Sequence, residues 1–385
     1  MSTCSAKTKP LAHKMTLVMT HQCNFDCKYC LQKHEDVAMP EETALKAIDI
    51  FVNGVKADIE AQKKASEENP SVTAQISFYG GEPLLQREKI EKLVGYSSAA
   101  LQAIPGVNFA YEITTNGTLL DEEFIAFAKK NRIILALSHD GLSQDPVRRD
   151  RGGHPTKDTV DGKLQMLLKA TPGTIIMMTV HPDYADRVSG SLKFFYDSGV
   201  RAVSMVLAHG ERVLWDEEKF SVLEKELEKV EEFYEQWNSG DNVFRFIPFD
   251  NKIRNYILNK DQDSKSCHFG CHKTMVDTDG RYYPCSHFIG RDGFNYGSVD
   301  EGVDEEKLDS LEKKRVEASE CAECALRARC RHTCACANHG HTGNMSEVSA
   351  LQCEYEQLTI RLADKAAAAL LGGENRKFIE RMYKE

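Results

Sequence analysis

The stretch HQCNFDCKYCLQ spaces three cysteines as C-x3-C-x2-C: Cys23, Cys27 and Cys30. Three thiolates are one ligand short of the four that close a tetrahedral structural zinc site. The same three can hold three irons of a cubane [4Fe–4S] cluster and leave the fourth iron open to a small molecule. Zinc stays an alternative, with His21 or His34 as the fourth ligand. Inert packing of the three thiols is the remaining alternative.

The composition restricts the class of protein to which the triad belongs. The chain has 385 residues, 41% hydrophobic and 28% charged, as in soluble globular proteins. Its formal charge of -10 argues against non-specific nucleic-acid binding. No apolar run is long enough for a membrane span, and the N-terminus lacks the apolar core of a secretory signal. We therefore expect a cytoplasmic protein, in which 13 cysteines serve metal binding rather than disulfides.

The elements that must position the triad alternate along the first 210 residues. Six short runs rich in Val, Ile and Leu predict strands buried on both faces, over 15–20, 74–80, 107–115, 132–138, 174–180 and 202–208. Amphipathic helical patterns separate them, the clearest over 40–64 with Pro40 at its start. Such βα units in series predict an α/β fold, a partial (β/α)6 TIM-like barrel.

The organisation changes towards the C-terminus. We expect a disordered tail over 1–13, the barrel over 14–212, a helical linker over 213–260, a small cysteine-rich domain of short strands and helices over 261–360, and a C-terminal helix over 361–385. Ligands of α/β sheets bind at the carboxyl ends of the strands, and the triad directly follows the first predicted strand. The triad should therefore lie at the mouth of the barrel.

At the ends of successive predicted strands the sequence resembles the radical S-adenosylmethionine (SAM) enzymes. Tyr29 precedes the last triad cysteine, Gly80-Gly81-Glu82-Pro83 resembles the GGEP motif, and TTNGT (114–118) and SHDG (138–141) end the next two strands. The resemblance implies a cluster on the triad that cleaves SAM to a 5′-deoxyadenosyl radical. For the SAM carboxylate it leaves the choice between Arg149 and Arg148 open. The SAM contacts it implies are Tyr29, Gly80, Gly81, Glu82, Thr114, Asn116, Ser138, Asp140, Arg149 and Leu207.

The later cysteines are similar to the SPASM extension of radical SAM proteins. They run from Cys267 to Cys285 around Gly280, and then as C-x2-C-x5-C-x3-C from Cys321. The resemblance implies two auxiliary [4Fe–4S] clusters, and so three clusters in all. The ligands of one auxiliary cluster would be Cys267, Cys271, Cys285 and Cys334. The ligands of the other would be Cys321, Cys324, Cys330 and Cys353. Cys4 and Cys336 are left over, and a pair of zinc knuckles is the alternative.

Within the SPASM proteins the chain resembles two groups of peptide maturases. Its length and domain order are similar to those of anaerobic sulfatase maturases, which oxidise Cys or Ser to formylglycine, but Ser286 stands where that group has an aspartate. The run YPCSHFIG (283–290) looks more like thioether-forming maturases of ribosomal peptides, of the sactipeptide and ranthipeptide type. The resemblance thus implies a precursor peptide as substrate, a flavodoxin- or ferredoxin-type electron donor, and a thioether product.

Two further readings stay open: a non-enzymatic metal-binding module, and an enzyme acting on a non-peptide substrate. Among side chains other than cysteine, histidines follow four predicted strands and should lie at the barrel mouth: His21, His139, His181 and His209. Exposed polar strand-end loops would explain any one of them. His139 is the candidate for catalysis because presumed SAM contacts flank it.

Overall fold

One twisted sheet of nine strands organises the chain, in the order β11-β10-β1-β3-β4-β5-β7-β8-β9. The computed structural model describes residues 12–65, 69–210, 212–240, 242–258, 269–270, 273–373 and 375–383. Neighbouring strands are parallel except β10 and β11, which pair antiparallel. Most of the tail expected over 1–13, including Cys4, lies outside the described residues, as do Cys267 and Cys271.

The six predicted barrel strands are present and consecutive in the sheet. They are β1 (Ala12–Thr20), β3 (Val72–Gly80), β4 (Val107–Thr115), β5 (Ile133–Ser138), β7 (Ile175–Val180) and β8 (Ala202–Leu207). β1 is buried on both faces over 15–20, as expected. β3 and β7 instead alternate between buried and half-buried residues. Strands of an incompletely closed barrel face packed helices on the outside and an open interior on the inside, which accounts for the alternation.

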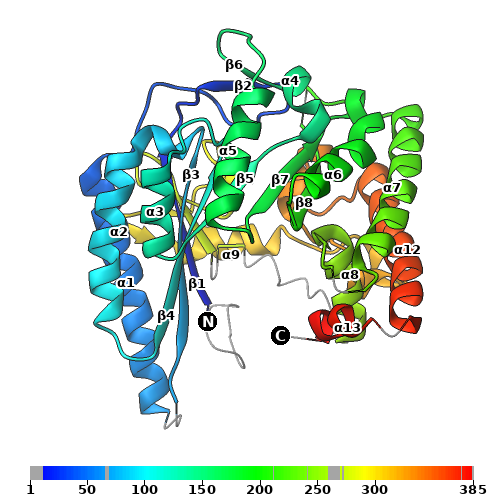
Figure 1. Cartoon of the computed structure of the whole chain (residues 1–385). Helices are drawn as coiled ribbons and strands as arrows, with labels where there is room; N and C mark the ends of the chain where they lie inside the picture. Colours follow the sequence, from blue (N-terminus) through cyan, green and yellow to red (C-terminus); the bar gives the residue numbers. More distant parts are fainter. Residues whose placement is uncertain are drawn as a thin grey trace.

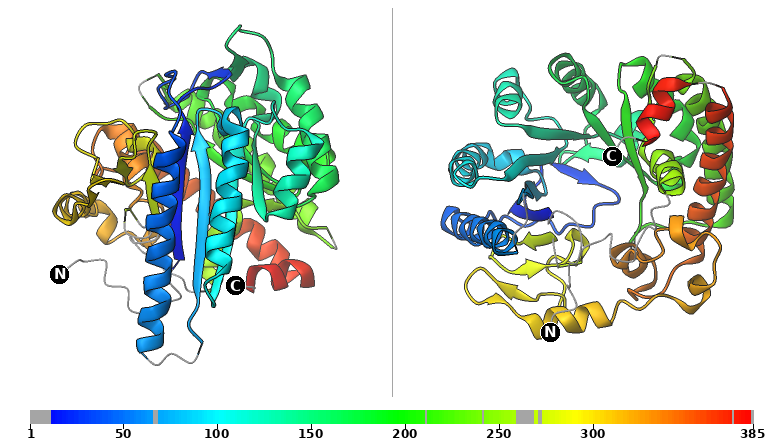
Figure 2. Two further views of the ribbon diagram at one scale, coloured as in Figure 1. Left: turned by 90° about the vertical axis from the view of Figure 1, so that its left-hand side faces the viewer. Right: turned by 90° about the horizontal axis from the view of Figure 1, so that it is seen from below.

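Helices cover the outer face of this curved sheet (Figures 1 and 2). In the barrel they are α1 (Glu41–Lys64), α2 (Arg87–Gln102), α3 (Glu122–Lys130), α5 (Lys157–Ala170) and α6 (Val188–Asp197). Local capping explains where some begin: the Asp121 side chain accepts a hydrogen bond from the N–H of Phe124 at the start of α3. Two short strands, β2 (Phe25–Cys27) and β6 (Arg148–Asp150), and the one-turn helix α4 (Gln144–Val147) lie at the mouth.

The segment expected as a linker extends the sheet of the barrel rather than merely connecting two parts. It contains α7 (Glu217–Asn238), β9 (Arg245–Phe246) and α8 (Ile247–Ile257). β9 pairs with β8 and so extends the sheet at one edge. At the other edge β10 (Lys273–Val276), from the cysteine-rich part, pairs parallel with β1. The C-terminal part therefore shares the barrel's sheet, which the sequence pattern did not indicate.

Short elements follow, as predicted for the cysteine-rich part. They are β11 (Tyr282–Tyr283), β12 (Gly297–Ser298), β13 (Gly302–Val303), α9 (Glu305–Lys313), α10 (Ser319–Ala322) and α11 (Ala335–Thr342). The C-terminal helical region begins earlier than 361, with α12 (Ala350–Gly372), and ends with α13 (Arg376–Tyr383). α12 packs on α7 and α8, where a buried Lys252–Glu356 ion pair joins the layers. None of the described helices is long and apolar enough to cross a bilayer.

Candidate functional site

The triad loop follows β1 at the mouth of the barrel, and pairing of its backbone with β6 holds it in place. β2 pairs antiparallel with β6, so that Cys27 lies opposite Arg148. The Arg151 guanidinium donates to the carbonyl of Cys23 over 2.6 Å, and the N–H of Phe25 donates to Cys23 Sγ over 3.4 Å. All three thiols are half-buried. These contacts position the triad loop against β6.

Two glycines bring the end of β3 against the same loop. A Cβ on Gly81 would lie 2.2 Å from the carbonyl oxygen of Gln22 and 3.0 Å from Cys23 Cβ. Gly80, with φ of +141°, would meet the carbonyl oxygen of Thr20 at 2.2 Å. The approach allows the N–H groups of Gly81 and Glu82 to donate to Thr20 and Gln22, both over 2.9 Å. Only glycine permits this contact, which explains the residue type at both positions.

Glu82 is buried beside the triad and links it to the end of β4. Its carboxylate accepts hydrogen bonds from the Thr115 hydroxyl over 2.7 Å and from the N–H of Asn116 over 2.8 Å. Burial raises the pKa of the Glu82 carboxyl, and these donors oppose that rise. Asn116 in turn donates to Asn24, next to Cys23, over 2.7 Å. The motif residues of two strands thus form one hydrogen-bonded unit with the triad loop.

A second buried unit joins Tyr29 to the end of β5. The Tyr29 hydroxyl donates to Asp140 over 2.5 Å and accepts from Arg148 over 2.6 Å. Asp140 is fully buried and also accepts from the N–H of Thr179. Burial raises the pKa of Asp140, against the opposing charge of Arg148. Within the described residues, the buried Nε of Arg148 has no hydrogen-bond partner.

Of the two arginines between which the motif left the choice, Arg148 is the one at the site. Arg149 is exposed, and its guanidinium donates to the backbone carbonyls of Asp145 and Gly153. The alternation of a strand explains the difference, because successive side chains of β6 point to opposite faces. A buried guanidinium with an unused N–H is a suitable partner for a carboxylate such as that of SAM.

His139 does not occupy the mouth, although its position in the sequence suggested that it would. Its ring is fully buried against Phe194 and Phe195. One ring nitrogen pairs with Asp161 of α5 at 2.7 Å, and the other accepts from the N–H of Gly141 at 2.9 Å. With both nitrogens engaged, His139 fixes the loop after β5 and has no free atom for proton transfer.

The other SAM contacts expected from the sequence lie at the ends of strands. Thr114 and Ser138 are half-buried at the ends of β4 and β5, and Leu207 is nearly buried at the end of β8. Thr115, not Thr114, makes the bond to Glu82. Sequence reasoning also missed Asn24 and Arg151, because neither belongs to a strand-end motif. Asn24 adjoins Cys23 in the sequence, which was the available signal, whereas Arg151 lies 128 residues from Cys23 and only the fold brings it there.

The surroundings of the triad bear on which metal group it can bind. Within the described residues, no three His, Cys, Asp or Glu side chains gather closely enough to bind one metal ion, but His34 Nε2 lies 3.4 Å from Cys30 Sγ, within reach as a fourth ligand. His21 pairs instead with Asp277 at 2.7 Å. Burial raises the pKa of Cys23 to about 11 and of Cys27 to about 12. Coordination to a metal cation such as iron would keep these thiols ionised.

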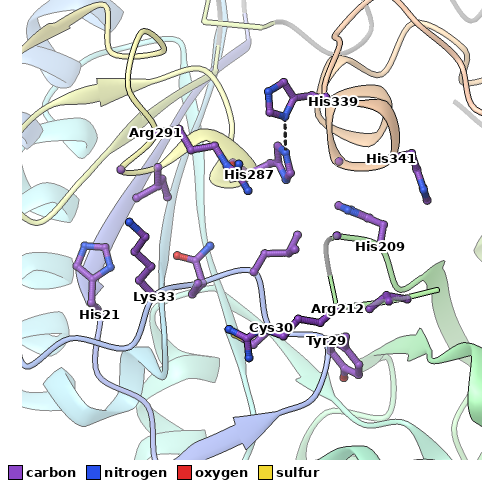
Figure 3. A pocket seen from close by; sticks show the side chains of 18 of the residues that line it. His21, Tyr29, Cys30, Lys33, His209, Arg212, His287, Arg291, His339 and His341 are labelled. Carbon is purple, nitrogen blue, oxygen red and sulfur yellow. Dashed lines mark hydrogen bonds between the residues drawn. The ribbon is translucent and has the colours of Figure 1, made fainter.

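A cavity of about 980 Å³ extends from the triad loop to the C-terminal part (Figure 3). Tyr29 and Cys30 line one side, His209 and Arg212 follow β8, and His287, Arg291, His339 and His341 come from the C-terminal part. Its volume is that of a small-molecule or side-chain binding site. The cavity therefore connects the triad with residues contributed by both ends of the chain.

Four imidazoles meet on one wall of this cavity: His209, His287, His339 and His341. His287 and His339 share a hydrogen bond of 3.1 Å, and the His209 ring lies 5.3 Å from that of His341. Burial lowers the pKa of His209 to about 4, so the ring is neutral near pH 7. Gly340 makes room for it, since a Cβ there would lie 2.5 Å from His209 Nδ1.

The described C-terminal cysteines form two groups. Cys334 and Cys336 have their sulfurs 3.4 Å apart, and interaction with Cys336 lowers the pKa of Cys285. Burial and the charges of Cys353 and Cys324 raise the pKa of Cys321, and burial and the charge of Cys321 raise the pKa of Cys330. The second group has the members of one expected ligand set, which stays a prediction. The first contains Cys336, which the sequence pattern left without a role.

Comparisons with known proteins support the assignment of the barrel. The profile of the Radical SAM superfamily matches residues 17–195. An uncharacterized protein, MJ0907, of Methanocaldococcus jannaschii is 34% identical over 151 residues, which are 38% of this chain and 46% of that protein. The cysteine-type anaerobic sulfatase-maturating enzyme of Clostridium novyi is 22% identical over 81% of this chain and 84% of its own length. The radical SAM cyclopropyl synthase TigE of Paramaledivibacter caminithermalis is 22% identical, over 90% and 72%.

Two solved structures share the fold over most of the chain. Native anSMEcpe with bound AdoMet and Kp18Cys peptide superposes with a TM-score of 0.75 at 19% identity, covering 93% of this chain and 99% of that one. Streptococcus suis SuiB bound to S-adenosylmethionine gives a TM-score of 0.57 at 15% identity, covering 89% and 77%. The architecture thus extends beyond the matched barrel into the C-terminal part.

Proposed function

Because residues 17–195 form a radical SAM domain, we propose that this radical SAM enzyme modifies a peptide by joining a cysteine sulfur to a carbon of another residue. The observation that carries the proposal is the cavity between the triad loop and the C-terminal part, because it offers a space for peptide side chains beside the radical source. The run around Cys285 that resembles thioether-forming maturases contributes His287 to its wall.

Three groups of residues would hold the cofactors. Cys23, Cys27 and Cys30 would bind a [4Fe–4S] cluster, Arg148 the SAM carboxylate, and Glu82 the SAM amino group. When bound, the cluster supplies the electron that cleaves SAM to a 5′-deoxyadenosyl radical. The protein's own contribution is to position and shield: the glycine pair, the Glu82 unit and the Tyr29–Asp140–Arg148 unit place the motif loops side by side.

The C-terminal cysteines would hold two further clusters, one on Cys285, Cys334 and residues 267 and 271, and the other on Cys321, Cys324, Cys330 and Cys353. The grouping of the described thiols supports these sets. The low-potential electron for SAM cleavage would come from a flavodoxin- or ferredoxin-type donor.

The bond formation defines what the site must accept. Joining sulfur to carbon takes a hydrogen atom from the carbon and a proton and an electron from the thiol. The hydrogen atom leaves with the adenosyl group, and the electron goes to an acceptor of the iron–sulfur class. A neutral base must take the proton. An imidazole of the cavity wall would have to serve; His209 itself is a weak base, because burial lowers its pKa to about 4, and its Nδ1 is buried against Gly340.

A second function, formylglycine formation, is supported by the similarity to sulfatase-maturating enzymes. Ser286 replaces the aspartate of that group, so its base would have to come from elsewhere. Asp277 is a carboxylate that lines the same cavity, although it is paired with His21 at 2.7 Å. The two functions differ in the fate of the peptide sulfur, which is retained in a thioether and lost in formylglycine.

The test is to incubate the anaerobically reconstituted enzyme with SAM, a reductant and a library of synthetic cysteine-containing peptides, and to follow products by mass spectrometry. A peptide that loses two hydrogens, keeps its sulfur and no longer reacts with thiol reagents is the expected result. A product that has lost sulfur and reacts with hydrazides would support formylglycine formation and overturn the thioether proposal. Deoxyadenosine without any peptide product from a library that contains all residue pairs would contradict both.

A further inference from the structure

Arg291 lines the cavity and has hydrogen-bond donors that the protein itself does not use. Its Nε donates to the carbonyl of His287 over 2.9 Å, which holds the guanidinium beside the wall that carries the imidazoles (Figure 3). The side chain is half-buried. Within the described residues, its two Nη atoms have no hydrogen-bond or ion-pair partner. A guanidinium held in this way presents its outer two nitrogens to whatever enters the cavity.

The carboxylates that line the cavity do not neutralise this charge. Asp277 pairs with His21 at 2.7 Å, and Glu35 and Asp292 are exposed. In the part of the chain that the structure describes, no carboxylate forms an ion pair with Arg291. Attraction between charges is stronger in a partly buried site than in bulk water, because the effective dielectric constant is lower. Arg291 is therefore suited to bind an anion that comes from outside the protein.

The neighbouring imidazoles add hydrogen-bonding nitrogens without adding charge. His339 Nδ1 shares its hydrogen bond with His287 Nε2, and His341 makes no hydrogen bond to a described residue. Burial and the charge of Arg291 lower the pKa of His287 to about 3, and they lower the pKa of His339 as well, so that both rings are neutral near pH 7. No three side chains of the described histidines gather closely enough to bind one metal ion. A neutral imidazole can instead donate its single N–H to an anion.

The charges around the cavity indicate which kind of anion fits. Arg291 is the half-buried cation of the cavity, whereas the other basic side chains that line it are exposed: Lys28, Lys33 and Arg212. One guanidinium matches a singly charged carboxylate, which its paired nitrogens can bind through two parallel hydrogen bonds, better than a phosphate with close to two charges. The chain as a whole has a formal charge of -10, so its overall field does not attract an acidic ligand, and binding must come from local contacts.

We propose that Arg291 binds a carboxylate of the peptide substrate. The inference rests on the proposed function, because a peptide enters the cavity in both candidate reactions. It adds the chemical class of that peptide, which has an acidic group near the cysteine that is modified. Cys30 of the triad loop lines the same cavity, so a carboxylate bound at Arg291 fixes how the rest of the peptide extends towards the radical source. Arg291 thus determines specificity and takes no part in bond formation.

The experiment measures binding, so that it does not depend on the reaction. Three sets of fluorescently labelled, cysteine-containing peptides are compared: one with Asp near the cysteine and an amidated C-terminus, one with Asn in place of Asp, and one with Asn and a free C-terminal carboxylate. Fluorescence anisotropy is recorded on the reconstituted protein with SAM and without reductant. We expect the wild-type protein to bind one of the two carboxylate sets about 10-fold more tightly than the amide set. The preferred set identifies a side-chain or a C-terminal carboxylate as the bound group.

Substitutions assign this preference to one side chain. Arg291→Gln should remove it, whereas Arg281→Gln should keep it, because Arg281 is exposed and pairs with Asp279 at 2.9 Å. Arg291→Lys keeps the charge but loses the paired nitrogens, so it should weaken the preference, and it replaces Arg291→Gln if circular dichroism shows that the latter does not fold. Equal binding of all three sets by the wild-type protein, or an unchanged preference in the Arg291 variants, would overturn the inference.

The reaction is followed separately on the same peptides after a reductant is added. A peptide product without any binding preference would overturn this inference and leave the proposed function intact. A binding preference without a thioether or formylglycine product would contradict the proposed function and leave Arg291 as a carboxylate site.

Discussion

The chain holds its cysteines in two different ways. In the barrel, backbone pairing of β2 with β6, the close approach of Gly81 and the guanidinium of Arg151 fix the triad loop. In the C-terminal part, single-turn hydrogen bonds place the thiols, such as those from the N–H of Cys324 to Cys321 and from the N–H of Cys330 to Arg327. Cys324 and Cys353 are exposed. More of the protein's own contacts therefore hold the first site than the second.

Metal loss should therefore have different consequences in the two regions. The triad loop keeps its protein contacts without a cluster, so that only chemistry is lost. In the C-terminal part, metal ligation supplies contacts that the protein does not, and the free energy of metal binding also stabilises the fold. Variants in each region and at the boundary between them test this difference.

The largest effect is expected from single ligand losses. Cys27→Ala should abolish 5′-deoxyadenosine formation with little change in the thermal unfolding of the protein, because β2 and β6 still pair. Cys330→Ala should leave nucleoside formation detectable but lower the unfolding temperature, because the free energy of metal binding there also stabilises the fold. Nucleoside assays and differential scanning calorimetry on both variants check this. An unfolding temperature lowered more by Cys27→Ala than by Cys330→Ala would reverse the comparison.

The second-largest effect is expected within the barrel, on the KM for SAM. Arg148→Met should raise the KM for SAM by about 10- to 100-fold, because a hydrogen bond to a charged group contributes about 1.5–3 kcal/mol. Arg149→Met is the matched control, since that side chain is exposed and bonds only backbone carbonyls. Steady-state assays of SAM cleavage measure both. A larger change for Arg149→Met would move the SAM carboxylate to the other face of β6.

The boundary between the two regions can be tested at Gly340. Gly340→Ala places a methyl group 2.5 Å from His209 Nδ1, and we expect a loss of about 1–3 kcal/mol of unfolding free energy. Gly162→Ala, in α5 with no atom within 4 Å of the new Cβ, should instead stabilise by up to about 1 kcal/mol. Urea unfolding of both variants provides the measurement. Equal stability would mean that α11 and the loop after β8 do not meet.

The last effect, small near neutral pH, is a pH dependence at the same boundary. The folded-state pKa of His209 is lowered from 6.5 to about 4 by burial and by the charges of His341 and Arg291. Between these values the unfolded chain binds the extra proton, so the stability supplied by the neutral ring is lost as pH falls from 6.5 towards 4. His209→Asn should flatten that part of the stability profile. An unchanged slope in the variant would show that the ring is solvated.

The sequence was sufficient to predict the strands and the motifs, but it was insufficient to predict which distant segments and side chains they contact. Six Val-, Ile- and Leu-rich runs predicted the six barrel strands because continuous apolar runs of that length form buried parallel strands. It could not show that β10 pairs with β1, since pairing between distant segments leaves no periodic signal. Nor could it show whether Arg148 or Arg149 faces the site, because that depends on which residues of the three-residue strand β6 point inward.

The histidines illustrate the same limit. His139 follows a strand, as a residue at the mouth should, but its rotamer directs the ring to Asp161 on the outer helix layer. His339 and His341 gave no signal, because they reach the cavity through the packing of α11 near His209. Cys336 appeared spare for a similar reason. Its sulfur lies 3.4 Å from that of Cys334, a contact that spacing alone does not specify.

The most direct test of the account is the cofactor content of the purified protein together with its ability to cleave SAM. The protein is prepared without oxygen, reconstituted, and assayed for iron, sulfide, zinc and 5′-deoxyadenosine beside the Cys23/Cys27/Cys30→Ala variant. We predict about twelve irons per chain, falling to about eight in the variant with complete loss of the nucleoside. Zinc in place of iron and no nucleoside from the wild-type protein would contradict the assignment of the triad as a radical source.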